Sequence, residues 1–322
     1  MVWVVLVPAG LLLAYLIGGV VLLQRLLTPG GVDWSGANNP NPPKDPLVLN
    51  YRGDPRTAFG FDFTTIQYMT EHGPAEAWLV PAREPSPLWA IYVHGIGGLR
   101  ENGYKQLSVL HEAGIPTLLI TYRNDRGAPA SPNRLYSFGL TEWRDLDAAI
   151  GWMQSRGAQR IVLVAESMGA AIAGQYLTHA ADISAIAALA LDAPALDFPS
   201  IPAGILGRYH APFATATAAL GIGALKLFTG TDLATANCMD AVARFERPLF
   251  LAHGTGDLLV PLAQSEELVA RRTAPTVFIQ TGATHLHSFN EDPARYRAAF
   301  LGFLDGLSRN SGGSGTSRGT SS

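Results

Sequence analysis

Three residues in the second half of the chain have the types and the order that nucleophilic hydrolysis needs. Ser167, Asp257 and His285 each come shortly after a short apolar run. A serine hydroxyl is a poor nucleophile near neutral pH, so a base must accept its proton during attack. The imidazole of His285 can accept that proton, and Asp257 can hold the ring in the right tautomer. The sequence therefore predicts a catalytic triad of these three residues.

Neighbouring residues offer alternatives for two of these roles. His287 lies two residues beyond His285, and Asp192 also follows an apolar run. Asp257 could instead cap a helix expected to begin near residue 262. We favour Asp257 because the glycines of its turn can aim the carboxylate inward. We favour His285 over His287 as the base, because an imidazole two residues further along the chain would reach a different position relative to Ser167.

The stretch around Ser167 predicts a sharp turn between a strand and a helix. An apolar run ends just before Ser167, small residues follow at once, and the next residues are typical of a helix. Such a turn needs small neighbours, which Ala165 and Gly169 supply in the pattern A-x-S-x-G. The alternative is an ordinary strand-to-helix junction capped by the serine.

Attack on a carbonyl creates a negative oxygen, which preorganised donors must stabilise. The glycine-rich stretch 92–98, YVHGIGG, allows the backbone to approach a ligand closely. We expect the backbone N–H groups of Ile96 and Met168 to form this oxyanion hole. His94 and His253 are expected to brace loops rather than to catalyse.

Alternating strands and helices must position these residues. An antiparallel hairpin is predicted over 61–69 and 75–80. The later strands are expected at 88–93, 117–122, 161–165, 186–191, 248–252 and 276–280. The intervening helices are expected at about 100–113, 141–155, 168–180, 262–272 and 292–307. This alternation predicts an α/β fold with a mostly parallel sheet covered by helices on both faces.

One connection between predicted strands is too long for a single helix and its loops. Between two predicted strands, residues 193–247 form an insert rich in Ala and Gly, and its part 198–231 carries only Arg208 and Lys226 as charged residues. An apolar insert of this kind could be a lid over a pocket. A pair of ordinary packing helices is the alternative.

Composition excludes several classes of protein. Of the 322 residues, 48% are hydrophobic and 15% charged, so a large core is possible. The net charge of −3 is spread without a basic cluster, which argues against nucleic acid as a partner. Cys238 is the only cysteine, which excludes an intramolecular disulfide and a multi-cysteine zinc site. No metal-ligand cluster or phosphate-binding loop stands out, so we expect neither a metal nor a cofactor. The oligomeric state stays open.

The N-terminal residues 2–24 carry no charge and are long enough to cross a bilayer, so they predict a transmembrane helix. A cleaved signal peptide fits less well, because no basic residue precedes the apolar run. A buried core helix is the other alternative. Arg25 and Lys44 follow the helix, which favours a single-pass protein of the cell membrane with a cytoplasmic catalytic domain.

The segments beside the predicted domain differ from it in composition. Residues 25–46 are rich in Gly, Pro and Asn and predict a spacer that lifts the domain off the membrane. Residues 308–322 lack apolar side chains and predict a disordered tail. The globular domain is therefore expected over 47–307.

Five motifs together resemble a known family. They are VHGIGG (93–98), TYRNDRGAPASP (121–132), AESMGAA (165–171), HGTGDLLVP (253–261) and GATH (282–285). As a set the chain resembles bacterial α/β-hydrolases of the serine aminopeptidase and monoglyceride-lipase type, close to membrane-anchored alpha/beta-hydrolase-domain proteins. The resemblance implies the α/β-hydrolase fold and places nucleophile, acid and base on Ser167, Asp257 and His285. It departs at Ala165, where such families usually have glycine.

These observations favour a membrane-anchored serine hydrolase that cleaves carboxylic esters through an acyl-serine intermediate. The expected substrate is a small molecule, an acyl ester or a lipid-like ester. A serine peptidase is the alternative within the same fold. It would need a site for a terminal amine, for which Asp197 and Glu166 are candidates by type alone. A membrane scaffold without turnover is the alternative from another class.

Overall fold

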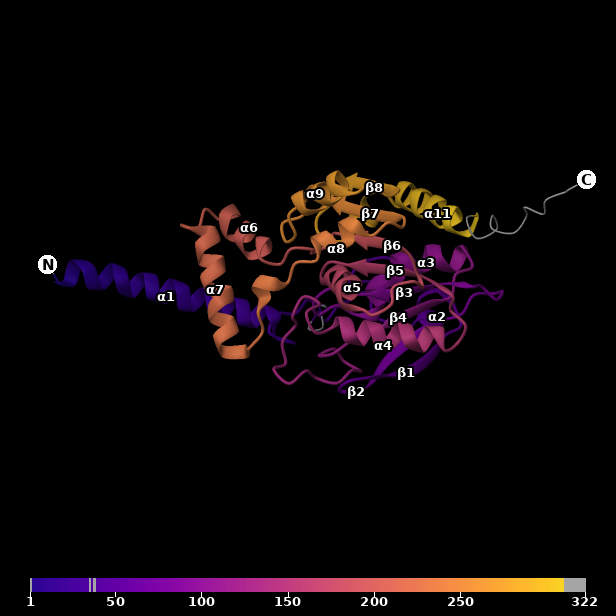
Figure 1. Ribbon diagram of the computed structural model, residues 1–322, viewed down its shortest axis with the longest axis horizontal. Coiled ribbons are helices and arrows are strands. Elements are labelled where there is room, and N and C mark those ends of the chain that lie inside the picture. The colour runs from indigo at the N-terminus through magenta and orange to yellow at the C-terminus, as the bar shows by residue number, and fades with distance from the viewer. Residues whose placement is uncertain (1, 35, 37–38, 310–322) are drawn as a thin grey trace, which may run out of the picture.

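A single sheet of eight strands forms the centre of the computed structural model, which describes residues 2–34, 36 and 39–309 (Figure 1). Its strand order is β1-β2-β4-β3-β5-β6-β7-β8. The hairpin of β1 and β2 is antiparallel, β2 pairs antiparallel with β4, and every later pair is parallel. The strands are β1 Thr64–Thr70, β2 Gly73–Val80, β3 Leu88–Val93, β4 Thr117–Ile120, β5 Arg160–Glu166, β6 Ile186–Asp192, β7 Leu249–Gly254 and β8 Thr276–Thr281. The mostly parallel sheet predicted from the sequence is confirmed.

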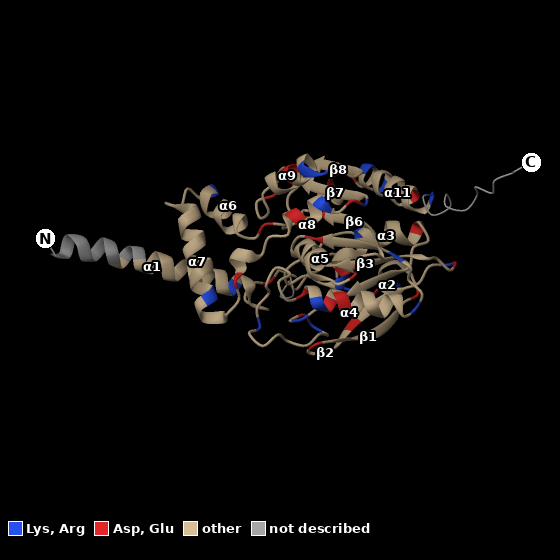
Figure 2. Ribbon diagram, in the orientation of Figure 1, with Lys and Arg blue, Asp and Glu red and all other residues tan. Residues whose placement is uncertain are grey.

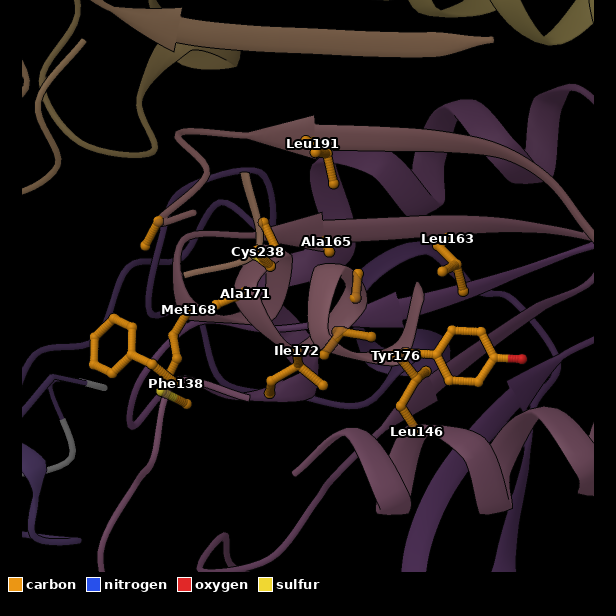
Figure 3. Packing of buried hydrophobic residues seen from close by; sticks show 14 of the residues in the cluster. Phe138, Leu146, Leu163, Ala165, Met168, Ala171, Ile172, Tyr176, Leu191 and Cys238 are labelled. Carbon is orange, nitrogen blue, oxygen red and sulfur yellow. The ribbon is translucent and has the colours of Figure 1, made fainter. Parts of the chain in front are cut away.

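Alternate side chains of the central strands enter two different cores, because successive residues of a strand face opposite sides of the sheet. In β5, Leu163 and Ala165 belong to one cluster, and Val162 and Val164 to the other. The first cluster includes side chains of α4 (Trp143–Gln154) and α5 (Met168–His179), as Figure 3 shows for Leu146, Ile172 and Tyr176. The second includes side chains of α3 (Tyr104–Glu112) and α11 (Pro293–Arg309).

Four further helical elements lie around the sheet (Figure 1). They are α2 Pro55–Phe59, the 3₁₀ turn η1 Arg100–Gly103, α9 Ala263–Arg271 and α10 Ser288–Glu291. The five predicted helices are present, with ends that differ by a few residues. Helix α2 was not predicted; it is one short turn in which the carboxylate of Asp54 accepts a hydrogen bond from the backbone N–H of Thr57.

The N-terminal helix α1 covers Val2–Leu27 and extends away from the sheet (Figure 1). The prediction of a helix there is confirmed, although α1 includes residues 25–27 of the predicted spacer. Among the residues that the structure describes, none of the helices combines the length and the apolar character that crossing a bilayer requires, so the predicted transmembrane span is not supported. The side chains of residues 2–9, 11 and 12 lie outside the described part.

The segment after α1 contacts the domain. The backbone N–H of Tyr136 donates to the carbonyl of Leu27 at 2.9 Å. Trp34 packs on Gly97, where an added Cβ would lie 2.9 Å from the indole. Just beyond the predicted spacer, Asn290 donates a hydrogen bond of 2.8 Å to the carbonyl of Leu47. The spacer that lifts the domain off a membrane stays a prediction.

The insert predicted at 193–247 is helical. It contains α6 Ser200–Arg208, α7 Ala214–Thr229, the 3₁₀ turn η2 Leu233–Thr235 and α8 Met239–Arg244. Helices α6 and α7 pack on each other, and α7 crosses α1 beside the sheet (Figure 1). Figure 2 shows few charged residues on α6, α7 and the described end of α1. Of the predicted C-terminal tail, residues 308–309 end α11, and residues 310–322 lie outside the described part.

Candidate active site

Ser167 occupies a strained turn between β5 and α5. Its backbone angles are φ 51° and ψ −122°, a conformation that costs a non-glycine residue about 1–3 kcal/mol. An added Cβ at Gly169 would overlap the carbonyl oxygen of Val93, so only glycine allows α5 to approach β3 this closely. The turn forms with Ala165 in place of glycine, and this side chain is buried in β5. The predicted strand, turn and helix are therefore present.

A chain of hydrogen bonds joins the three residues that the sequence singles out. The Nε2 atom of His285 lies 3.0 Å from Oγ of Ser167. The Nδ1 atom of the same ring lies 2.6 Å from Oδ2 of Asp257. Ser167 follows β5, Asp257 follows β7 and His285 follows β8, so the carboxyl ends of parallel strands bring them to one edge of the sheet. The arrangement can pass a proton from the hydroxyl to the imidazole.

Asp257 lies in a site that stabilises its ionised form. Burial alone raises the pKa of this carboxyl, but hydrogen bonds from His253 and His285, the charge of His285 and the N–H of Val260 outweigh burial and lower the pKa. The N–H groups of Leu259 and Val260 donate to Oδ1 at 2.8 and 2.9 Å. A carboxylate that stays ionised can orient the histidine and balance the charge of an imidazolium.

His253 braces this carboxylate, which agrees with the role expected for it. Its Nε2 atom lies 3.2 Å from Oδ2 of Asp257, and its Nδ1 atom lies 2.7 Å from Oγ of Ser265. The rival residues lie elsewhere. The Nδ1 atom of His287 is 2.7 Å from the carbonyl of His285, and Asp192 is the buried last residue of β6, outside the hydrogen-bonded chain. The geometry therefore favours His285 and Asp257 over both alternatives.

The loop that follows β3 lies against the serine. An added Cβ at Gly95 would lie 3.0 Å from the Cβ of Ser167. The N–H of Gly98 donates to the carbonyl of Gly95, which closes a tight turn around Ile96. Met168 is the first residue of α5, where a backbone N–H has no acceptor within the helix. Ile96 lines the same cavity as Ser167, and Met168 follows Ser167 directly in the chain, so their role as oxyanion donors stays a prediction.

A buried polar group supports this loop from behind. The Nδ1 atom of His94 lies 2.8 Å from the carbonyl of Gly95, and its Nε2 atom lies 2.9 Å from Oδ2 of Asp125. The hydroxyl of Tyr122 donates to the same carbonyl at 3.0 Å. Burial lowers the pKa of His94, but the charge and hydrogen bond of Asp125 outweigh it and raise the pKa. His94 therefore braces the loop, as expected.

A cavity of about 240 Å³ opens at Ser167 and His285. This volume lies just below the roughly 300–1,000 Å³ of pockets for drug-sized ligands. Apolar side chains of α1 and α6 form much of its wall, among them Leu23, Leu27 and Ile205. The contribution of α1 could not be predicted from the sequence, because an apolar stretch before a Gly- and Pro-rich segment does not indicate that its end packs on the domain.

Lys105 is a further residue at the site that the sequence pattern did not indicate. This residue of α3 is buried, and its ammonium donates a 2.8 Å hydrogen bond to the carbonyl of Leu286, next to His285. The same nitrogen lies 4.0 Å from a carboxylate oxygen of Glu166, next to Ser167. A single lysine on a helix ordinarily indicates the solvent-exposed face, so the pattern offered no signal.

The two carboxylates considered for an amine site are not arranged as a pair. Glu166 is buried beside Lys105, and burial raises the pKa of its carboxyl although Lys105 opposes this. Asp197 accepts a 3.0 Å hydrogen bond from Asn237 and lies outside the lining of the cavity. No acidic pair from these two residues faces the described cavity.

The comparisons with known proteins agree on the architecture. The model of the Alpha/beta hydrolase family matches residues 90–299. An uncharacterized protein of Salmonella typhimurium, YfhR, is 25% identical over 275 residues, which cover 79% of this chain and 84% of that protein.

Solved structures of other hydrolases have a similar fold. The esterase Pf2001 of Pyrococcus furiosus has a TM-score of 0.64 at 20% identity and covers 83% of this chain and 97% of its own. A puromycin-hydrolyzing peptidase of Mycobacterium tuberculosis has a TM-score of 0.59 at 18% identity and covers 81% of this chain and 42% of its own. At such identities these two likenesses concern the fold alone.

Proposed function

The chain belongs to the alpha/beta hydrolase family, and we propose that it is a serine hydrolase that cleaves carboxylic esters. We propose further that the acyl group of the ester is an apolar, lipid-like chain. The observation that carries this proposal is the hydrogen-bonded chain of Ser167, His285 and Asp257, of which Ser167 and His285 line an apolar cavity. Acyl transfer by a serine needs a base in contact with the nucleophile and a carboxylate in contact with the base.

In the proposed reaction, Oγ of Ser167 attacks the ester carbonyl while Nε2 of His285 accepts its proton. The N–H groups of Ile96 and Met168 stabilise the oxygen of the tetrahedral intermediate. Collapse of this intermediate breaks the bond to the alcohol, which leaves with the proton from His285. Water then attacks the acyl-serine, again with His285 as base, and releases the acid and the free hydroxyl.

The substrate class follows from the character of the cavity. Apolar side chains favour an acid chain of methylene groups, since each buried methylene contributes about 0.8 kcal/mol. A sugar or nucleotide would need many polar partners there. The Pyrococcus furiosus protein of similar fold is described as an esterase, which agrees with this class.

A series of p-nitrophenyl esters from acetate to palmitate tests the proposal on the full chain. Hydrolysis is expected, and Ser167→Ala should reduce kcat/KM by several orders of magnitude. A fluorophosphonate should label the wild-type protein and leave Ser167→Ala unlabelled. Labelling without ester cleavage would favour a peptidase, whose fold is also among the similar structures. Neither labelling nor cleavage would favour a scaffold without turnover.

We also propose that the protein associates with the cell membrane through α1, with the catalytic domain on the cytoplasmic side. Large apolar side chains of this helix are exposed, including Leu13, Ile17 and Leu22. Exposed apolar groups of this size favour contact with lipid. Fractionation of cells tests the association: the protein should sediment with membranes and dissolve in detergent. Recovery in the supernatant without detergent would contradict it.

A further inference from the structure

The cavity at Ser167 is closed on one side by the end of α1. Leu23, Leu26 and Leu27 all line it. These positions are three and four residues apart, so they share one face of the helix. Leu27 is 1% exposed and Leu23 9%, whereas the neighbouring Leu22 is 58% exposed. The helix therefore presents one face to the cavity and another to the surroundings of the protein.

This wall is held in place by contacts at both ends. The carbonyl of Leu27 accepts from the N–H of Tyr136 at 2.9 Å, and the indole N–H of Trp34 donates to the carbonyl of Leu26 at 3.3 Å. Leu23 lies against Gly221 of α7, where an added Cβ would be 4.0 Å from its side chain. A wall fixed in this way can select ligands by shape, because packed side chains yield little to a larger group.

A second part of the wall comes from a distant part of the chain. Ile201, Pro202 and Ile205 of α6 line the same cavity as α1. Both parts of the wall are apolar, and Ser167 and His285 line the cavity with them. An apolar chain attached to the ester carbonyl would therefore find the side chains of both helices within this cavity.

We propose that the C-terminal end of α1 is part of the acyl-binding site, and that Leu23 and Leu26 set the length of the acid chain that the enzyme accepts. This inference rests on the proposed function as an ester hydrolase. It assigns to the N-terminal helix a role in substrate selection in addition to any role in membrane association.

The test measures kcat/KM of the full chain in one detergent for p-nitrophenyl acetate, butyrate, octanoate and laurate. Leu23→Trp and Leu26→Phe fill the cavity, and excluding two methylene groups should lower the ratio of octanoate to acetate by more than about tenfold. Leu26→Ala enlarges it and should move the optimum to longer chains. These opposite shifts cannot both result from misfolding.

Leu22→Trp is the matched control, since this side chain is on the same helix turn but points away from the cavity. The ratio of kcat/KM for octanoate to kcat/KM for acetate should be the same in Leu22→Trp as in the wild type. Unchanged ratios in all three cavity variants, with normal hydrolysis of acetate, would overturn the inference and leave the proposed function intact. A wild-type protein that cleaves no ester would instead overturn the proposed function.

A second series separates the acid side of the ester from the alcohol side. Acetate esters of alcohols from ethanol to dodecanol keep the acid constant. The variants should leave the length dependence in this series as in the wild type. A shift in the alcohol series, without one in the acid series, would place the alcohol against α1 and contradict the proposal.

Discussion

The ammonium of Lys105 donates a hydrogen bond of 2.8 Å to the backbone carbonyl of Leu286, although α3 and the loop after β8 are 181 residues apart in the chain. The bond connects a buried charge to the segment that carries His285. The carboxylate of Glu166, beside the nucleophile, lies 4.0 Å from the same nitrogen. One lysine thus lies against both the loop that carries His285 and the end of β5 that precedes Ser167.

We expect Lys105→Met to lower the free energy of unfolding by about 3–5 kcal/mol, because it leaves Glu166 buried without its opposite charge. Urea unfolding measures this change. The double variant with Glu166→Gln should recover part of the loss, since the buried charge is then removed. A double variant no more stable than Lys105→Met alone would contradict the argument.

Asp257→Asn should reduce kcat by about 10³–10⁴-fold, because the histidine loses the partner that fixes its tautomer. Single-turnover hydrolysis of p-nitrophenyl butyrate measures the effect. The matched control is Asp292→Asn just before α11, whose carboxylate accepts from the N–H of Arg295 and does not line the cavity at Ser167. Equal rates in the two variants would show that Asp257 has no part in the reaction.

The lowered pKa of Asp257 predicts how stability depends on pH. A carboxyl whose pKa is lower in the folded state than its ordinary 3.8 is stabilised by folding in its ionised form. This contribution is fully present above 3.8 and is lost as the pH falls through the folded-state value. The difference in free energy of unfolding between wild type and Asp257→Asn should therefore shrink below about pH 4. A difference that stays constant from pH 7 to pH 3 would contradict this prediction.

Gly169→Ala should lower the free energy of unfolding by about 1–3 kcal/mol and slow fluorophosphonate labelling, because the added methyl group overlaps the carbonyl of Val93. Gly151→Ala is the matched control within α4, where an added Cβ meets nothing within 4 Å. This control should raise stability by about 0.5–1 kcal/mol, since alanine loses less backbone entropy in a helix. Similar effects of the two substitutions would argue against close packing between α5 and β3 at the turn that holds Ser167.

The sheet could be predicted from the sequence because short apolar runs alternated with amphipathic segments. Strand β3 coincides with the expected 88–93, and α5 begins at Met168 as expected. The positions of Ser167, Asp257 and His285 could be predicted for the same reason, since each follows a strand and parallel strands end at one edge.

The missed features depend on contacts between distant segments, which local patterns do not encode. Lys105 reads as an exposed residue of a helix, and only the fold shows that the loop after β8 covers it. Trp34 lies in a Gly- and Pro-rich stretch that predicts a spacer, yet its indole packs on Gly97. In both cases tertiary packing decided the outcome, and composition gave no information about the partner.

The crossing of α1 and α7 has a consequence for biosynthesis. Chains are made from the N-terminus, so α1 is complete long before residues 214–229, which form α7, have been translated. During that interval the apolar end of α1 lacks the helix that packs on it in the finished protein. His285 is translated later still, after β7 and β8 have been made. A growing chain therefore exposes the face of α1 that α7 later covers, at a time when His285 has not yet joined Ser167 and Asp257. Both conditions end only when the last third of the polypeptide has folded.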